Sequence, residues 1–400
     1  MLDSILIKPA GPDCNLDCNY CFYKCKEELF KDSVHRMSIE TLEKCLYEFI
    51  KIAKPESSIC FQGGEPTLMG LSFFQYASEY IKKNLPVGMH IALSIQTNGI
   101  LLDDDFCDFL ARERWLVGLS IDGNKQEHDL YRKKCDGSGS FAEVSEAMKR
   151  LKRHGVDFNT LTVITRANVD KPKELFRFFM EYGNGYMQFI PCYEENNGVP
   201  CDFCCQPEQF GLFLCQMFDL WYDSGKIRAY IRFYEELLHS YVTLASAGCS
   251  YGPECIAAPV VEHTGDVYPC DFFVDKFWRL GNVNDDSLER MICSEKAVEF
   301  RRLKRDLAPE CDKCKWRCIC NGDCKKNRMP NGKSYFCQSY KMFFEYSRPR
   351  FLELKSQLLA GDTPKAVYYA GVNREIRRNS QCPCGSGRKY KKCCMPIKSA

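Results

Sequence analysis

The sequence predicts an α/β protein whose first half folds around a parallel sheet, either open or closed into a barrel. Three observations support this fold class. Short apolar runs alternate with amphipathic segments over the first 225 residues. The unusual residues of this half follow the ends of the apolar runs, where parallel sheets place their functional groups. Beyond about residue 235 the alternation fades, and cysteines dominate from Cys249 to Cys337.

Six repeated strand–helix units account for the first half. We expect strands at 4–10, 57–66, 90–99, 115–123, 158–165 and 185–192. The amphipathic segments between them have helical spacing, and we expect helices at 37–53, 73–85, 103–114, 141–155 and 171–183. Ser38 is placed to cap the first helix and Gly155 to end the fourth. A further helix is expected at 341–360.

Cysteine is the most unusual feature of the composition, with 27 among 400 residues. The N-terminus lacks a basic start followed by a long apolar run. No apolar run approaches the roughly 20 residues that a membrane-spanning helix needs. We therefore expect a cytoplasmic protein that does not engage a membrane. In a reducing cytosol, clustered cysteines indicate metal sites rather than disulfides.

The net charge of +2 conceals a basic C-terminal tail. Residues 365–400 hold nine Lys or Arg and one acid, a local charge of +8. Such a tail suits an acidic partner surface or nucleic acid, although a solvated charged face has the same composition.

The first cysteine cluster lies in the loop after the first expected strand. Cys14, Cys18 and Cys21 are close enough in sequence for their sulfurs to converge on one centre. A closed zinc or iron–sulfur site needs four ligands, and Cys25 could supply the fourth. Alternatively, three thiolates on a 4Fe–4S cluster leave one iron open to a small molecule. The stretch alone leaves both interpretations open.

This loop resembles the cluster-binding motif of the radical S-adenosylmethionine (SAM) superfamily, because the aromatic Phe22 follows its third cysteine. The segment Gly63–Pro66, GGEP, resembles the methionine-binding segment of that superfamily. The order of the strand–helix units matches its partial (β/α)6 barrel. The resemblance implies SAM as a cofactor and a 4Fe–4S cluster on the three cysteines. The SAM contacts that it implies are Tyr20, Gly63, Gly64, Glu65, Ser120, Arg132 and Tyr193.

Five of these seven contacts have a chemical reason. Glycines let the backbone approach a ligand, and Glu65 can help receive the methionine ammonium group. The hydroxyl of Ser120 can reach the ribose or carboxylate, and Arg132 can pair with a carboxylate. Ser120 as a capping residue and Arg132 as a surface residue are the structural alternatives.

The second cysteine cluster, in the C-terminal half, resembles the SPASM extension of radical SAM enzymes. Its eight cysteines make two closed sets of four, for which the resemblance implies two auxiliary 4Fe–4S clusters. The first set that it implies is Cys249, Cys255, Cys270 and Cys324. The second is Cys311, Cys314, Cys320 and Cys337. Two structural zinc ions are the alternative, because they also favour closed cysteine sites.

The third cluster lies in the basic tail. Cys382, Cys384, Cys393 and Cys394 resemble the SEC-C zinc module, in which four thiolates favour tetrahedral zinc. The module is expected either to dock a partner or to be a small fold without one. Twelve cysteines have no assigned role: Cys25, Cys45, Cys60, Cys107, Cys135, Cys192, Cys201, Cys204, Cys205, Cys215, Cys293 and Cys318. Cys201, Cys204 and Cys205 are close together, and we interpret them as reduced thiols rather than a further metal site.

Residues 1–365 resemble the anaerobic sulfatase-maturating enzymes. This resemblance implies oxidation of a cysteine or serine, in a Cys/Ser-x-Pro/Ala-x-Arg motif, to Cα-formylglycine. It makes Asp271, directly after Cys270, the base that takes the proton from the side-chain thiol or hydroxyl. A loop acid or an orienting partner of the cluster is the alternative for Asp271. The implied partners are an unfolded or nascent sulfatase and a low-potential electron donor.

The expected domains are a radical SAM barrel at 1–235, a SPASM domain at 236–365 and a linker with the zinc module at 366–400. Two alternative functions remain. A SPASM enzyme that forms thioether or carbon–carbon crosslinks in a ribosomal peptide would share every cluster. A non-catalytic cluster or zinc adaptor would not cleave SAM.

Overall fold

The computed structural model describes residues 1–30, 34–243, 245–246, 248–361, 378–379, 388–392 and 395. The four cysteines expected to bind zinc, Cys382, Cys384, Cys393 and Cys394, lie outside these described residues. The chain forms two compact units that interleave along the sequence. The first unit contains residues 1–162, 178–184 and 257–301, and the second contains residues 163–177, 185–256 and 302–400.

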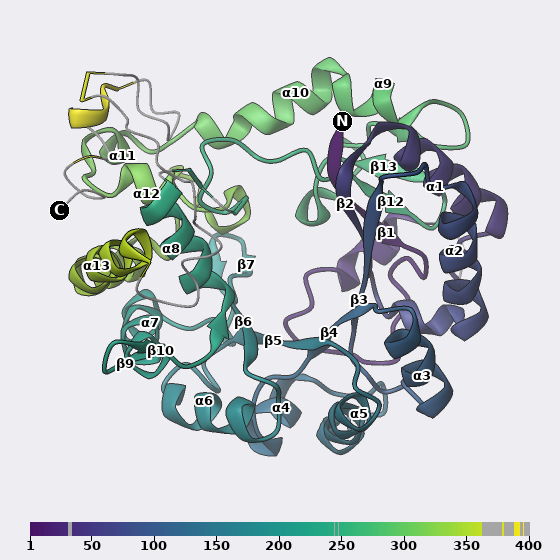
Figure 1. Ribbon diagram of the computed structural model, residues 1–400, viewed down its shortest axis with the longest axis horizontal. Helices are drawn as coiled ribbons and strands as arrows, with labels where there is room; N and C mark the ends of the chain where they lie inside the picture. Colours follow the sequence, from purple (N-terminus) through teal and green to yellow (C-terminus); the bar gives the residue numbers. More distant parts are fainter. Residues whose placement is uncertain are drawn as a thin grey trace. The chain divides into compact units, whose positions relative to one another are not determined.

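The first unit is built on parallel strands, which confirms the predicted α/β class. The strands, in their order across the sheet, are β1 (Leu2–Lys8), β2 (Ala53–Phe61), β3 (His90–Thr97), β4 (Leu116–Ser120) and β5 (Phe158–Ile164). The helices between them are α1 (Ile39–Ile52), α2 (Leu71–Asn84), α3 (Asp104–Arg112), α4 (Lys125–Tyr131) and α5 (Phe141–Arg153). The next helix, α6 (Pro172–Glu181), contains residues of both units. In Figure 1, α1, α2 and α3 line one side of the strands. The alternation of strands and helices follows the order predicted from the sequence.

Helix ends agree with the predicted signals. The Ser38 hydroxyl accepts a 3.1 Å hydrogen bond from the Thr41 N–H and caps α1. Gly155 follows α5 with a φ of +67°, a conformation that glycine adopts without strain. An aromatic cluster packs beneath the strands, where Trp115 stacks on Phe61 and meets Phe74 edge to face. These large buried rings fix the helices against the sheet.

A late part of the chain completes the first unit at the free edge of β1, which the sequence did not predict. The strand β12 (Val260–Glu262) pairs in parallel with β1, so that Leu6 lies opposite Val260. The strands β13 (Asp266–Tyr268) and β14 (Gly281–Asn282) follow in antiparallel pairing. A short 3-10 helix, Asp271–Phe273, comes next after β13 and places Asp271 at this edge. The helices α9 (Leu288–Cys293) and α10 (Glu295–Arg302) follow.

The second unit is mainly helical. Its strand β6 (Tyr186–Pro191) pairs in parallel with β11 (Tyr230–Ile231), and β7 (Glu195–Asn196) forms a hairpin with β8 (Val199–Pro200). A second hairpin joins β9 (Tyr222–Asp223) to β10 (Lys226–Ile227). The principal helices are α7 (Pro207–Trp221), α8 (Arg232–Thr243) and α13 (Cys337–Ala360), with short α11 (Pro309–Lys313) and α12 (Arg317–Cys320). The helix expected at 341–360 therefore exists and begins four residues earlier, at Cys337.

Aromatic side chains join the helices of the second unit. Phe218 of α7 meets Tyr234 of α8 edge to face, and it packs against Phe351 of α13 with ring centroids 5.0 Å apart. Within the ranges that the structure describes, no helix combines the length and apolar character needed to cross a membrane.

Candidate active site

The cysteine loop packs against the glycines that follow β2. The Gly64 N–H donates a 2.8 Å hydrogen bond to the Gly11 carbonyl, and the Glu65 N–H donates a 2.7 Å bond to the Asp13 carbonyl. A Cβ atom on Gly64 would lie 2.0 Å from the Asp13 carbonyl oxygen, so only glycine fits there. The GGEP segment and the cysteine loop are therefore one packed element, although they are about fifty residues apart in sequence.

Glu65 is buried, with 1% of its surface exposed, and it joins the ends of two strands. Its carboxylate accepts hydrogen bonds from the backbone and hydroxyl of Thr67, from the hydroxyl of Thr97 and from the N–H of Asn98. Burial raises the pKa of Glu65. The expected contact with a ligand ammonium group stays a prediction, since these donors already organise the carboxylate.

The three cysteines of the loop lie close enough to influence one another. Burial raises the pKa of Cys14 to about 12, with Glu65 and the other two thiols adding to the effect. Burial also raises the pKa of Cys18 to about 11, while Cys21 is exposed. Such thiols lose their protons when the sulfur atoms bind a cationic metal centre. These cysteines therefore suit an iron–sulfur cluster. Among the described residues, no three metal-binding side chains are grouped tightly enough to hold an ion as they stand.

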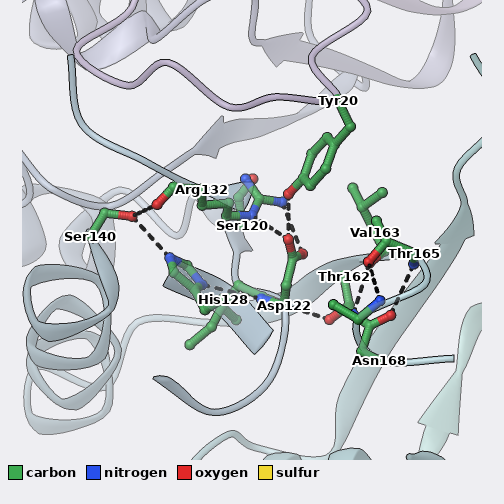
Figure 2. Close-up of polar contacts among 12 residues, drawn as sticks. Tyr20, Ser120, Asp122, His128, Arg132, Ser140, Thr162, Val163, Thr165 and Asn168 are labelled. Carbon is green, nitrogen blue, oxygen red and sulfur yellow. Dashed lines mark hydrogen bonds and ion pairs between the residues drawn. The ribbon is translucent and has the colours of Figure 1, made fainter. Parts of the chain in front are cut away.

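Tyr20, between Cys18 and Cys21 in the loop, is tied to the end of β4 (Figure 2). Its hydroxyl donates to the Asp122 carboxylate, which also receives Nε of Arg132 at 3.0 Å and Nη2 at 3.2 Å. The guanidinium lies 5.5 Å from the centre of the Tyr20 ring. Arg132 is therefore a buried partner of Asp122, rather than a surface arginine, and two of the expected SAM contacts meet on one carboxylate.

Ser120 is the last residue of β4, and its hydroxyl accepts a 2.9 Å hydrogen bond from Nε2 of Gln96 on β3. A Cβ atom on Gly118 would lie 2.0 Å from the Gln96 side chain, so this glycine makes room for the amide. Six of the expected SAM contacts lie in the first unit: Tyr20, Gly63, Gly64, Glu65, Ser120 and Arg132. Tyr193, the remaining expected contact outside it, belongs to the second unit.

Asp271 has two side-chain partners near the cysteine loop. Its Oδ2 accepts a 2.7 Å hydrogen bond from Gln62, and its Oδ1 forms an ion pair with Lys8. Lys8, the last residue of β1, is 1% exposed, and its ammonium lies 3.3 Å from the centre of the Tyr23 ring. Tyr23 donates its hydroxyl to the buried carboxylate of Glu262. The carboxylate of Asp271 is therefore oriented from two sides by residues at the ends of β1 and β2.

The second unit contains a pocket whose lining includes all four cysteines of one expected auxiliary set. They are Cys311, Cys314, Cys320 and Cys337. The apolar wall of this pocket comes from Trp316, Tyr340 and Phe344. Burial raises the pKa of Cys320 and of Cys311, with neighbouring thiols adding to both. The sequence-predicted set is thus gathered around one space, and it suits a thiolate-bound cluster.

The other expected set is divided between the two units. Cys249, Cys255 and Cys324 belong to the second unit, whereas Cys270 belongs to the first. A hydrogen bond from the Cys255 thiol lowers the pKa of Cys249 to about 6. The buried Lys304 ammonium holds the loop of Cys249 through the carbonyls of residues 249 and 250. The assignment of these four cysteines to one cluster stays a prediction.

Arg328 organises the cysteine-rich segment of the second unit, and sequence reasoning did not single it out. Its guanidinium donates to five backbone carbonyls, at distances from 2.6 to 3.3 Å. The acceptors are the carbonyls of Lys304, Asp306, Asn321, Gly322 and Asp323. Residues 321–323 have positive φ angles, so their carbonyls turn toward this one side chain. The spacing of residues in the sequence does not predict these hydrogen bonds of Arg328, because they depend on backbone conformation.

Two of the cysteines without an assigned role, Cys192 and Cys204, contact one another near the end of β6. A hydrogen bond from Cys192 lowers the pKa of Cys204 to about 7, and the Glu194 N–H donates to the Cys204 sulfur at 3.3 Å. Tyr193 stacks on Tyr335, with ring centroids 4.6 Å apart. The Lys326 ammonium donates to the Tyr193 carbonyl and to the Glu194 carboxylate.

Family models match three parts of the chain. The radical SAM superfamily matches residues 9–179, an iron–sulfur cluster-binding domain named SPASM matches residues 255–315, and the SEC-C motif matches residues 378–396. The first and third matches cover the first and third cysteine clusters, and the SPASM match includes Cys255, Cys270, Cys311 and Cys314 of the second. No ion is assigned by the SEC-C match itself.

Curated relatives match most of the chain. A cysteine-type anaerobic sulfatase-maturating enzyme of Clostridium perfringens is 37% identical over 367 residues, which cover 89% of this chain and 99% of the relative. A serine-type anaerobic sulfatase-maturating enzyme of Bacteroides thetaiotaomicron is 34% identical, covering 92% of this chain and 94% of the relative.

A solved structure agrees with these relatives. Native anSMEcpe with bound AdoMet (SAM) and the Kp18Cys peptide superposes with a TM-score of 0.81 at 36% identity, covering 88% of this chain and 99% of that one. The strand–helix order, the cysteine loop with its GGEP partner and the similarity over nearly the full length of these relatives agree with one another. This chain belongs to the anaerobic sulfatase-maturating enzymes of the radical SAM superfamily.

Proposed function

We propose that this protein oxidises one cysteine or serine of a sulfatase polypeptide to Cα-formylglycine. The observation that carries the proposal is the 37% identity over 99% of a curated sulfatase-maturating enzyme, in a chain whose cysteine loop and GGEP segment pack as one element. Bound peptide in the solved relative supports a peptide substrate for this chain as well. Relatives of both the cysteine type and the serine type support a target of either kind.

The proposed cofactors are SAM and three 4Fe–4S clusters. Cys14, Cys18 and Cys21 would hold a 4Fe–4S cluster, whose chemistry would be one-electron reduction of SAM, breaking its carbon–sulfur bond to give methionine and a hydrogen-abstracting 5′-deoxyadenosyl radical. The residues that would hold SAM are Tyr20, Gly63, Gly64, Glu65, Ser120, Arg132 and Tyr193. Their proposed task is to orient SAM and exclude water from the radical. The expected domains at 1–235, 236–365 and 366–400 correspond to SAM binding, auxiliary clusters and the zinc module.

Asp271 is the proposed base. Removal of one hydrogen atom, one proton and one electron from –CH2–OH leaves the aldehyde. The same removal from –CH2–SH leaves a thioaldehyde, which water would hydrolyse to the aldehyde with release of hydrogen sulfide. Asp271 would take the proton, because the thiol or hydroxyl must lose it as the electron departs. The hydrogen bond from Gln62 and the ion pair with Lys8 orient the Asp271 carboxylate for this task.

Eight cysteines are the proposed ligands of two auxiliary clusters that accept the departing electron. The pocket lined by Cys311, Cys314, Cys320 and Cys337 supports the second set. The C-terminal module would bind one zinc ion through Cys382, Cys384, Cys393 and Cys394 and serve as a basic docking module. A low-potential electron donor is a further proposed partner.

An anaerobic assay of reconstituted protein tests the proposal. The assay contains SAM, a reductant and peptides that carry Cys-x-Pro-x-Arg or Ser-x-Pro-x-Arg. Both 5′-deoxyadenosine and peptide mass are followed, and an aldehyde is trapped with a hydrazine. Aldehyde product supports sulfatase maturation and ranks the two residues. SAM cleavage without peptide change favours a peptide-crosslinking enzyme, and absence of SAM cleavage favours a cluster or zinc adaptor.

A further inference from the structure

His128 and Ser140 form a buried chain of hydrogen bonds beside Asp122 and Arg132 (Figure 2). The Asp122 N–H donates to Nδ1 of His128 at 3.3 Å, and Nε2 of His128 lies 3.0 Å from the Ser140 hydroxyl. That hydroxyl donates its hydrogen to the carbonyl of Arg132 at 2.8 Å. Both His128 and Ser140 are fully buried.

These contacts fix the protonation of the imidazole. The single hydroxyl hydrogen of Ser140 is used on the Arg132 carbonyl, so Ser140 must accept from the Nε2–H of His128. Nδ1 of His128 must then be unprotonated, because it accepts from the Asp122 N–H. Burial, followed by the Arg132 charge, lowers the pKa of His128 to about 4. The imidazole is therefore a neutral link between the backbone of Asp122 and the backbone of Arg132.

The anchored carbonyl of Arg132 lies at the start of a segment that supports the cysteine loop. We call residues 131–140 the strap. The strap folds back on itself through a bridge between Lys133 and Gly139. The Asp17 N–H donates to the Lys133 carbonyl at 2.7 Å, and the Asn19 N–H donates to the Tyr131 carbonyl at 3.1 Å. Backbone bonds therefore connect the strap to the loop on both sides of Cys18.

Two routes thus lead from His128 and Ser140 to the cysteine loop. One passes through the strap backbone, and the other passes through Asp122 to the hydroxyl of Tyr20. Arg132 takes part in both, since its carbonyl belongs to the first route and its guanidinium binds Asp122 on the second. We propose that His128 and Ser140 are positioning residues for SAM, which hold Arg132, Tyr20 and the cysteine loop in the arrangement that binds it. This inference rests on the proposed function, because Tyr20 and Arg132 are the SAM contacts proposed above.

The test measures the dissociation constant of SAM for the reconstituted full-length protein, together with the midpoint of thermal unfolding. Ser140→Ala removes both bonds of the hydroxyl, and His128→Asn keeps an acceptor for the Asp122 N–H but loses the donor to Ser140. Each should raise the SAM dissociation constant about tenfold, as expected for residues that orient binding groups. His128→Gln places an amide donor toward Ser140 and should stay within about threefold of the wild type.

Ser347→Ala is the matched control. Ser347 is also fully buried and donates to one backbone carbonyl, that of Phe343, at 2.8 Å in α13. Its loss should lower the midpoint of unfolding and leave SAM binding unchanged. In steady-state SAM cleavage, Ser140→Ala should raise KM for SAM while kcat stays within about twofold.

Three results would overturn the inference in distinguishable ways. An unchanged SAM dissociation constant in Ser140→Ala, with a thermal midpoint lowered as in Ser347→Ala, would leave only a structural role. If Ser140→Ala does not fold, equal SAM affinity of His128→Asn and His128→Gln would remove the proposed link. Wild-type protein that carries the loop cluster and does not bind SAM would overturn the proposed function itself, and the inference with it.

Discussion

The carboxylate of Glu65 accepts a 2.8 Å hydrogen bond from the backbone N–H of Asn98, which joins the end of β2 to the end of β3. The Asn98 side chain continues the connection, since its amide donates to the Asn15 side chain at 2.7 Å and approaches the Cys14 sulfur at 3.8 Å. One buried acid therefore orders the strand ends and the first cysteine together.

Replacing Glu65 with glutamine should destabilise the first unit. The amide has one acceptor oxygen, and its NH2 group would face donors that the carboxylate now satisfies. We expect a loss of about 2–4 kcal/mol in the free energy of unfolding, measured by urea denaturation. Glu79→Gln, on the exposed side of α2, is the control. Equal stability of the two variants would show that the carboxylate is not needed there.

Arg328→Lys should loosen the cysteine-rich segment of the second unit. A lysine ammonium has three donor hydrogens and cannot reach five carbonyls that now bind one planar guanidinium. The expected loss in the free energy of unfolding is about 3 kcal/mol, accompanied by lower iron content. Arg290→Lys, at an exposed ion pair with Asp286, should change neither quantity. Retention of full iron and stability in Arg328→Lys would refute this prediction.

Asp271→Asn should separate SAM cleavage from product formation. The amide cannot take a proton from the target, so aldehyde yield per turnover should fall about 100-fold while 5′-deoxyadenosine still forms. Asp285→Asn, at an exposed position of the same unit, is the control. The two products are measured together by mass spectrometry. Full aldehyde yield from Asp271→Asn would remove Asp271 from the mechanism.

The buried neutral imidazole of His128 predicts a dependence of stability on pH. Its pKa is lowered to about 4 from an ordinary value of 6.5, so below pH 6.5 the unfolded chain binds a proton that the folded chain does not. The contribution of His128 to the free energy of unfolding is therefore fully present above pH 6.5, and it declines as the pH falls toward 4. Between pH 7.5 and pH 5 the titration of this group should lower the free energy of unfolding by about 2 kcal/mol.

The contribution of His128 can be isolated by comparison with His128→Gln. The glutamine variant has no group that titrates at this position, so the difference in the free energy of unfolding between the two proteins should shrink by that amount at pH 5. Urea denaturation of both proteins at the two pH values provides the measurement. A difference that is the same at both pH values would contradict a buried neutral His128.

The zinc module makes a prediction about metal content. Four thiolates favour about one tetrahedral zinc ion per chain, which a double substitution of Cys382→Ser and Cys384→Ser should remove. Iron content and SAM cleavage should be unchanged, because these cysteines are separate from the proposed cluster ligands. Elemental analysis of purified protein measures both metals. If the zinc content of the double variant stays at the wild-type level, the zinc ion is bound at another site.

The sequence predicted those features that local patterns determine. The helix cap at Ser38 and the strand–helix order follow from spacing, whereas the grouping of Cys311, Cys314, Cys320 and Cys337 came from the family resemblance and stays a prediction. Periodicity and short-range chemistry are visible in one dimension, because the residues concerned are neighbours in the chain or repeat along it. The structure has both the predicted cap at Ser38 and the predicted order of strands and helices.

Long-range polar contacts were not predictable in this way. The pairing of Arg132 with Asp122, the bond between Gln62 and Asp271 and the five carbonyls around Arg328 depend on how separate segments meet. A buried charge needs a partner, because leaving it unpaired is costly in free energy. Burial alone does not determine which residue that partner is. The pairing of β12 with the edge of β1 was not predictable either, because three residues are too few to show the sequence pattern of a strand.

The pairing of β1 with β12 has a consequence for synthesis on the ribosome. β1 is made within the first eight residues, whereas β12 begins at Val260, about two hundred residues after the end of β2. At ordinary rates of translation this interval lasts roughly 10–40 s. Throughout it the loop of Cys14, Cys18 and Cys21 exists without Asp271 beside it. The order of translation therefore exposes the loop of Cys14, Cys18 and Cys21 before β12, which precedes Asp271 in the chain, can pair with β1.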